Sequence, residues 1–172
     1  MPRMSLYASV PQLSKMLRNL KEWMADGAEL AKTKDFEPSV LLSARLAPDQ
    51  YPLLKQIQAV CDAAKFAAAR VAGKTPPVHE DTEQTWEQIM ARVDSVVQYL
   101  DTFTEADFEG AEERVVALPF LPGKGAKGLV YFNEMALPNF YFHLNMAYAI
   151  LRHNGVAMGK VAYIGGFELV DL

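Results

Sequence analysis

Residues 138–155 read PNFYFHLNMAYAILRHNG, and this stretch decides the fold of the chain. It is long enough for about four to five helical turns, and its final pair, Asn154-Gly155, commonly ends a helix. Pro138 removes one backbone hydrogen bond from a helix and so kinks or restarts it. The sequence therefore predicts a last helix over residues 129–154 that is disturbed near Pro138.

Three earlier segments carry apolar residues at steps of three and four, the pattern of helices that lay one face on a core. They predict helices over residues 6–32, 50–72 and 82–102, and Gly73 supplies a stop for the second of them. Four amphipathic helices with mostly short connections are typical of a four-helix bundle. We therefore predict an all-α fold, an antiparallel four-helix bundle.

The pattern changes at two places outside the predicted helices. Residues 113–118 are β-prone and bounded by prolines, so we expect a small β-hairpin or an extended insert before the last helix. The glycine-lysine loop over 123–128 departs from the spacing of a phosphate-binding P-loop, which favours a hairpin turn. Residues from about 156 to 172 are apolar and broken by glycines, so we expect an extended C-terminal tail on a single domain over 1–172.

The composition excludes several classes of protein. With 51% hydrophobic and 22% charged residues among 172, the chain has an ordinary globular composition. Its net charge of −4 and the lack of a dense Lys/Arg stripe predict no nucleic-acid partner. Its one cysteine, Cys61, excludes an internal disulfide and a cysteine-based zinc cluster. The sequence has no run of about 18 apolar residues and no apolar signal-peptide core, so we expect no membrane partner and a cytoplasmic protein.

Four short motifs carry a resemblance to a known family. They are SLY at 5–7, LLSARLAPD at 41–49, LPNFYFH at 137–143 and AYAILRHNG at 147–155. With these motifs the chain resembles the DinB/YfiT-like superfamily, and within it an uncharacterised bacterial branch known only as a domain of unknown function. The resemblance covers roughly residues 4–160 and implies the same four-helix bundle.

The resemblance also implies where a metal would be held. In metal-bearing members three histidines bind a divalent ion, one from the second helix and two as H-x-x-x-H from the fourth. Here the second of that pair falls on His143, the first falls on Asn139, and the position on the second helix falls near Gln58 or Ala59. Carboxamide oxygens are weak ligands for zinc or nickel. We therefore expect no tight metal site and no cofactor beyond a weakly bound divalent metal, with His143 as the only matching ligand.

Two polar pairs could still form a pocket in the bundle. Asn139 and His143 are four residues apart and share a helix face, as do Gln58 and Asp62 on the second helix. If the two pairs face each other, Asp62 could orient the imidazole of His143 for acid–base chemistry. The alternative is a buried polar cluster that fixes helix register and does no chemistry. His79 lies in a proline-flanked loop, and the sequence assigns it no role.

Three functions remain open at this point. The first is a small-molecule binding or structural module that has lost the metal chemistry of its superfamily. The second, implied by the metal-bearing relatives, is a metal-dependent transferase acting on a low-molecular-weight thiol, so whether the protein is an enzyme is undecided. The third is an interaction protein that works as a homodimer, because residues 156–172 carry too much apolar surface to leave in water. We expect this tail to pack along a bundle, its own or a twin's.

Overall fold

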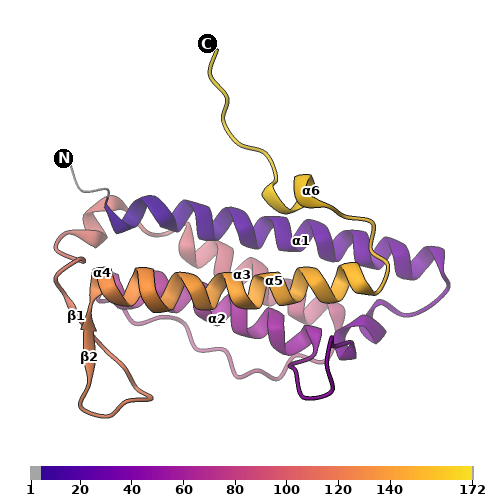
Figure 1. Ribbon diagram of the computed structural model, residues 1–172, viewed down its shortest axis with the longest axis horizontal. Helices are drawn as coiled ribbons and strands as arrows, with labels where there is room; N and C mark the ends of the chain where they lie inside the picture. Colours follow the sequence, from indigo (N-terminus) through magenta and orange to yellow (C-terminus); the bar gives the residue numbers. More distant parts are fainter. Residues whose placement is uncertain (1–4, 172) are drawn as a thin grey trace.

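Four long helices dominate the computed structural model, which describes residues 5–171 (Figure 1). The prediction of an all-α bundle with a small β-hairpin is confirmed. Residues 1–4 and 172, the ends of the predicted domain and tail, lie outside the described residues. None of the described helices is long and apolar enough to cross a membrane. The main helices are α1 (Val10–Thr33), α2 (Leu53–Ala72), α3 (Trp86–Leu100) and α5 (Leu137–His153), and short 3-10 helices cover Leu6–Ser9, Pro38–Ser43 and Glu105–Phe108.

The helices follow the order α1, α3, α2, α5 around the bundle. α1 and α5 run in one direction, and α2 and α3 run in the opposite direction (Figure 1). Because α2 and α3 run the same way, residues 73–85 must return along the bundle between them, and they do so along its lower side in Figure 1. The sequence predicts mostly short connections, and this crossover (residues 73–85) is longer because of the parallel arrangement.

The ends of α2 and α3 follow local sequence signals. Gly73 ends α2 with a left-handed φ of 70°, and its N–H bonds to carbonyls of the last turn, as expected of a glycine stop. α3 begins at Trp86 rather than near residue 82. Thr85 and Gln88 form a reciprocal capping box at its start. Asp81, at the predicted start, lies instead in the crossover, where its carboxylate binds Arg92.

The last helix passes Pro138 by changing its winding. α4 (Gly128–Val130) leads into a π-helical segment (Tyr131–Ala136), which continues directly into α5. A proline ring in a regular helix collides with the carbonyl four residues before it and removes one hydrogen bond. The wider π turn ends just before Pro138, which takes a first-turn position of α5. The disturbance that the sequence predicts near Pro138 is therefore a change of helix type without a break.

The insert between α3 and the last helix is a two-stranded antiparallel hairpin. β1 (Val115–Ala117) pairs with β2 (Gly125–Lys127), with Val116 opposite Ala126. The glycine-lysine stretch forms the second strand and part of the turn. Gly128 follows directly, and a Cβ at this position would collide with the backbone carbonyl oxygen of Ala111. The close approach of these two backbone segments therefore requires glycine where the last helix begins.

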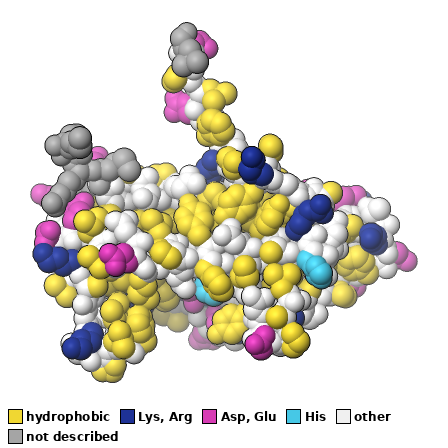
Figure 2. All heavy atoms as spheres, in the orientation of Figure 1, with side chains coloured by type: hydrophobic (Ala, Val, Ile, Leu, Met, Phe, Trp, Pro, Cys, Tyr) yellow, Lys and Arg dark blue, Asp and Glu magenta, His cyan; other side chains and the backbone are white. Residues whose placement is uncertain are grey.

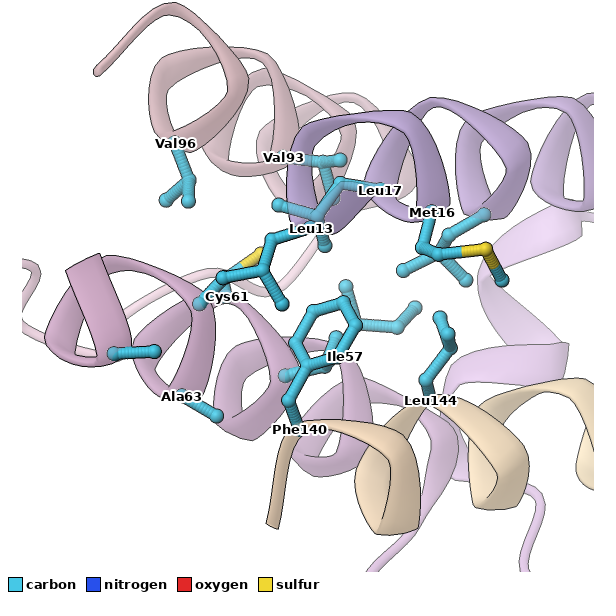
Figure 3. Packing of buried hydrophobic residues seen from close by; sticks show 14 of the residues in the cluster. Leu13, Met16, Leu17, Ile57, Cys61, Ala63, Val93, Val96, Phe140 and Leu144 are labelled. Carbon is cyan, nitrogen blue, oxygen red and sulfur yellow. The ribbon is translucent and has the colours of Figure 1, made fainter. Parts of the chain in front are cut away.

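The core lies between the four helices, and each of them contributes fully buried side chains (Figure 3). Removing an aliphatic or aromatic side chain of this kind from water contributes about 1.5–3 kcal/mol. The small residues of α2 allow α5 to approach closely, and these two helices share the most extensive contact in the bundle. The labelled core residues in Figure 3 include Leu13 and Leu17 of α1, Ile57 and Cys61 of α2, Val93 and Val96 of α3, and Phe140 and Leu144 of α5.

The first part of the C-terminal segment packs on the bundle, and the last residues extend away from it. Val156 and Met158 are buried, and α6 (Lys160–Ile164) lies on α1, whereas the sequence predicts an extended chain here. Trp23 fixes α6 by donating to the carbonyl of Ala162 at 3.0 Å and by stacking on the ring of Tyr163. The residues after α6 extend away from the bundle (Figure 1).

Replacing Gly128 with alanine should lower the free energy of unfolding by roughly 1–3 kcal/mol, because the new methyl group overpacks a contact between two backbone segments. Urea unfolding followed by circular dichroism measures this loss. Gly166→Ala is the matched control, since a Cβ there meets no atom within 4 Å, and its stability should stay within about 0.5 kcal/mol of the wild type. Equal stabilities for the two variants would contradict the close approach at Gly128.

Candidate functional site

His143 points from α5 toward the first turn of α2. Its Nδ1 lies 2.8 Å from Oε1 of Gln56, a fully buried side chain. Gln56 donates through its own Nε2 to the backbone carbonyl of Tyr51 at 3.4 Å, which directs its Oε1 to the histidine. A carboxamide oxygen can only accept, so Nδ1 of His143 carries the proton and Nε2 keeps a free lone pair.

The surroundings of His143 favour the neutral imidazole. The ring is half-buried, and this desolvation lowers the pKa of His143 below its ordinary value of 6.5. Tyr51 stacks nearly parallel to the ring with centroids 6.5 Å apart, and Phe142 packs edge-on at 5.2 Å. No carboxylate within the described residues orients this imidazole. A neutral histidine with an unprotonated Nε2 can accept a hydrogen bond from a ligand.

The two predicted polar pairs do not face each other. Asn139 is exposed one turn before His143, whereas Gln58 and Asp62 lie on another side of α2. Gln56 and Gln58 point about 200° apart around a helix, since each residue turns it by about 100°. Gln56 therefore reaches α5, while Gln58 faces α3 and the crossover. Sequence reasoning missed Gln56, because nothing in the sequence shows which of the polar residues of α2 meets α5.

Arg92 organises the region that contains Gln58 and Asp62. Its guanidinium is buried on α3 and binds the carboxylates of Asp62 at 2.7 Å, Asp81 at 2.6 Å and Glu83 at 3.1 Å. Gln58 donates to the second oxygen of Glu83 at 2.8 Å. Burial alone would raise the pKa values of Asp81 and Glu83, but hydrogen bonds from Arg92 and other donors hold both below their usual range.

Lys65 and His79 extend this network. The ammonium group of Lys65 is fully buried and lies 2.8 Å from both Oδ1 of Asp62 and Nδ1 of His79. An ammonium only donates, so Nδ1 of His79 accepts and its Nε2 carries the proton toward Ser95. Burial and the neighbouring Lys65 lower the pKa of His79. His79, which the sequence left without a role, thus joins the crossover to both α2 and α3.

Cys61 lies beside the network at the centre of the bundle. It is completely buried, and burial raises the pKa of its thiol to about 12. A nucleophilic cysteine needs a sulfur that is exposed and ionised to the thiolate. The sulfur of Cys61 is buried, and its raised pKa keeps the thiol protonated. The cysteine is therefore part of the core.

A cavity of about 230 Å³ borders both regions. Its lining residues are Tyr51, Lys55, Gln58, Ala59, Asp62 and Asp81. Two of the four predicted pocket residues, Gln58 and Asp62, thus line a cavity, and Tyr51, which stacks on His143, lines the same cavity. The carboxamide oxygen of Gln58 is buried and has no hydrogen-bond partner within the described residues. A larger hollow of about 400 Å³ at the end of α1 contains no histidine and lies away from the predicted residues.

The donors around His143 do not fit the metal site of the metal-bearing relatives. Within residues 5–171, no group of three or more His, Cys, Asp or Glu side chains could hold a metal ion. His143 bonds to the carboxamide of Gln56, and the carboxamide of Asn139 is exposed one helical turn away on α5. One imidazole with two carboxamides is a poor ligand set for zinc or nickel.

Comparison with known proteins places this chain in a family. A crystal structure of a DinB family member protein from Shewanella denitrificans is 40% identical, covers 98% of this chain and 100% of its own, and has a TM-score of 0.92. The fold is therefore that of a DinB-like helical bundle. The model of the domain of unknown function DUF1993 matches residues 6–164, and the chain belongs to this family. The resemblance that the motifs predict is confirmed. No curated protein is significantly similar to the chain.

The hydrogen bond to Gln56 predicts the protonation of His143. Nitrogen-15 NMR of the imidazole should show the neutral ring protonated on Nδ1, with a titration midpoint below 6.5. Gln56→Leu should remove the preference for Nδ1, because the acceptor is lost, whereas Gln12→Leu at an exposed position of α1 should leave the signals unchanged. A midpoint above 6.5 or an Nε2-protonated ring in the wild type would contradict this arrangement.

Replacing Arg92 with methionine should lower the free energy of unfolding by about 3 kcal/mol at neutral pH, because three carboxylates lose the buried cation that they share. The matched control is Arg18→Met, which breaks a single exposed pair with Asp101 and should cost at most about 1 kcal/mol.

The loss in the free energy of unfolding caused by Arg92→Met should also depend on pH. The pKa values of Asp81 and Glu83 are depressed in the folded protein, so their stabilisation is present above their ordinary values and is lost as the pH falls through the folded ones. The difference between wild type and Arg92→Met should therefore shrink as the pH falls below 4.5, the higher of the two ordinary values. Urea unfolding at several pH values measures it, and a constant difference would show that the network does not hold these carboxylates.

Proposed function

We propose that this DUF1993 protein is a small-molecule binding module whose ligand occupies the cavity beside Tyr51, Gln58 and Asp62. One observation carries the proposal: the carboxamide oxygen of Gln58 is buried without a partner in a side chain that lines this cavity. An unsatisfied buried acceptor costs about 1–3 kcal/mol. The oxygen is enclosed, so a ligand in the cavity reaches it when the side chain of Gln58 turns toward the cavity, and a hydrogen bond donated there would recover part of that free energy.

The lining residues favour a small ligand with hydrogen-bond donors. Asp62 uses one carboxylate oxygen, Oδ1, for both Lys65 and Arg92, and its side chain is 31% exposed. Asp62 and Gln58 therefore offer acceptors, and the exposed ring of Tyr51 offers an apolar and aromatic wall. A primary amine suits this combination, because an ammonium binds carboxylates and packs against aromatic faces. At about 230 Å³, the cavity is smaller than the pockets that hold drug-sized molecules.

Tyr51 connects the proposed ligand to His143. Its ring stacks on the imidazole at 6.5 Å, and its backbone carbonyl accepts from Gln56, which holds Nδ1 of the histidine. A ligand that moves Tyr51 therefore alters the surroundings of His143. This contact supports treating His143 as part of the binding region, with Asn139 exposed at its rim.

The alternative function is a metal-dependent transferase acting on a low-molecular-weight thiol. It would need a divalent ion beside His143, and the carboxamides of Gln56 and Asn139 give it weak support. A cytoplasmic location and the absence of a nucleic-acid partner stay predictions from the sequence.

We also propose that the protein is a homodimer. The support is the exposed apolar surface of the C-terminal segment, in which Phe167 is 69%, Leu169 78% and Val170 81% exposed. Contiguous apolar side chains of this kind usually mark a protein interface.

The binding proposal predicts that small primary amines shift the ¹H–¹⁵N NMR signals of α2 and the side-chain amide of Gln58, whereas the matching carboxylic acids do not. Gln58→Met should weaken amine binding roughly 10-fold or more, because it removes the acceptor. Gln12→Met, on an exposed face of α1, is the matched control and should bind like the wild type. Shifts confined to other parts of the chain, or equal affinities for Gln58→Met and wild type, would contradict the proposed site.

Metal titration of the same samples distinguishes the transferase function from the binding function. Titration with zinc or nickel should give weak, substoichiometric binding. Stoichiometric binding that His143→Ala abolishes would favour the transferase over the binding module.

A further inference from the structure

The end of α6 directs the chain away from the bundle at a fixed point. Asn19 of α1 donates to the carbonyl of Tyr163 at 2.9 Å and to that of Ile164 at 3.2 Å. Gly165 follows with a φ of 68°, and a Cβ there would lie 2.6 Å from the side-chain oxygen of Asn19. Only glycine fits this turn. The anchored helix therefore sets where the tail (residues 165–171) begins and where it leaves the body (Figure 1).

The tail has the composition of a segment that binds another surface. Phe167 and Leu169 alternate with Glu168, so in an extended chain the two apolar side chains share one face. Both are largely exposed, as is Val170. The acidic residues Glu168 and Asp171 form no ion pair within the described residues. The tail thus combines an uncovered apolar face with unpaired negative charge.

A complementary surface lies at the foot of the tail. Leu137, Tyr141 and Tyr148 of α5 pack only partly into the core, and they lie on the side of the bundle where Tyr163 sits. Figure 2 shows hydrophobic side chains gathered over this side, directly below the tail. We define this surface, formed by α1, α5 and α6, as the α1–α5 face.

Two lysines supply the opposite charge on the α1–α5 face. Lys15 is partly buried one helical turn before Asn19, on the same side of α1. Lys160 is exposed at the start of α6. Neither forms an ion pair within residues 5–171. Unpaired lysines therefore border the apolar surface, and unpaired carboxylates follow the apolar residues of the tail.

From this complementarity we propose that two copies of the chain exchange tails, with residues 165–171 of each lying across the α1–α5 face of its twin. The inference rests on the proposed homodimer and specifies its interface. A two-fold axis beside α6 brings the two α1–α5 faces together, because each tail starts at the edge of its own face. Seven extended residues reach up to about 23 Å, enough to follow four turns of a helix in the twin. The contact is reciprocal, so it closes a dimer and forms no open chain.

The test is the mass of the full chain in solution, measured by sedimentation over a range of concentrations. The wild type should be a dimer, and Phe167→Asp with Leu169→Asp should raise the dissociation constant at least about 100-fold. Val78→Asp, at a valine that is 86% exposed in the crossover, is the matched control and should stay dimeric. The helix content of all variants should be unchanged, since the tail lies outside the bundle.

A charge exchange identifies the face. Lys15→Glu with Lys160→Glu should weaken the dimer, and adding Glu168→Lys with Asp171→Lys should restore it, because the attraction returns with its sign reversed. A dimeric wild type whose mass is unaffected by the tail variants would overturn the exchange and leave the homodimer standing. Tail variants that lose stability without losing the dimer would place the tail on its own subunit, which also overturns the exchange. A monomeric wild type would overturn the homodimer itself.

Discussion

The buried guanidinium of Arg92 is the constraint on which the rest of the structure depends. A cation removed from water is tolerated only when carboxylates and hydrogen-bond acceptors surround it. α2 supplies one carboxylate and the crossover supplies two, so the crossover must pass beside α3 at the level of Arg92. These ion pairs tie α3 to α2 and to the crossover. They also place Gln58 and Asp62 at the cavity, because the same network fixes their side chains.

The buried network and the site at His143 occupy opposite sides of the same helix. α2 directs Gln56 toward α5 and directs Gln58 and Asp62 toward α3. The two regions meet at Tyr51, whose ring reaches the imidazole and also lines the cavity. At Gln58, one of the positions where the resemblance implies a histidine in metal-bearing members, this chain has a carboxamide that bonds to Glu83. The replacement changes a position suited to binding ions into one suited to hydrogen bonding.

The parts of the fold that depend on local signals could be predicted from the sequence. Apolar stripes gave the four helices, and Gly73 and Asn154-Gly155 gave two of their ends, because such signals act within one or two turns. The start of α3 was misplaced, because Asp81 has the chemistry of a helix cap and binds a distant arginine instead. The helix directions and the facing of Gln56 and His143 depend on contacts between segments more than 80 residues apart. The spacing of residues within α2 or α5 does not show that Gln56 and His143 face each other.

The position of Cys61 gives the chain a reporter of its own internal motion. Its thiol is completely buried at the centre of the bundle, beside the charges of Arg92 and Asp62. A thiol-specific reagent can reach this sulfur only after α2 separates from its neighbours, because no other path leads to a fully enclosed atom. The rate of labelling therefore counts openings of the native bundle, and the chain needs no added probe for it. Any ligand that closes the cavity on α2 would slow that rate in proportion to its occupancy.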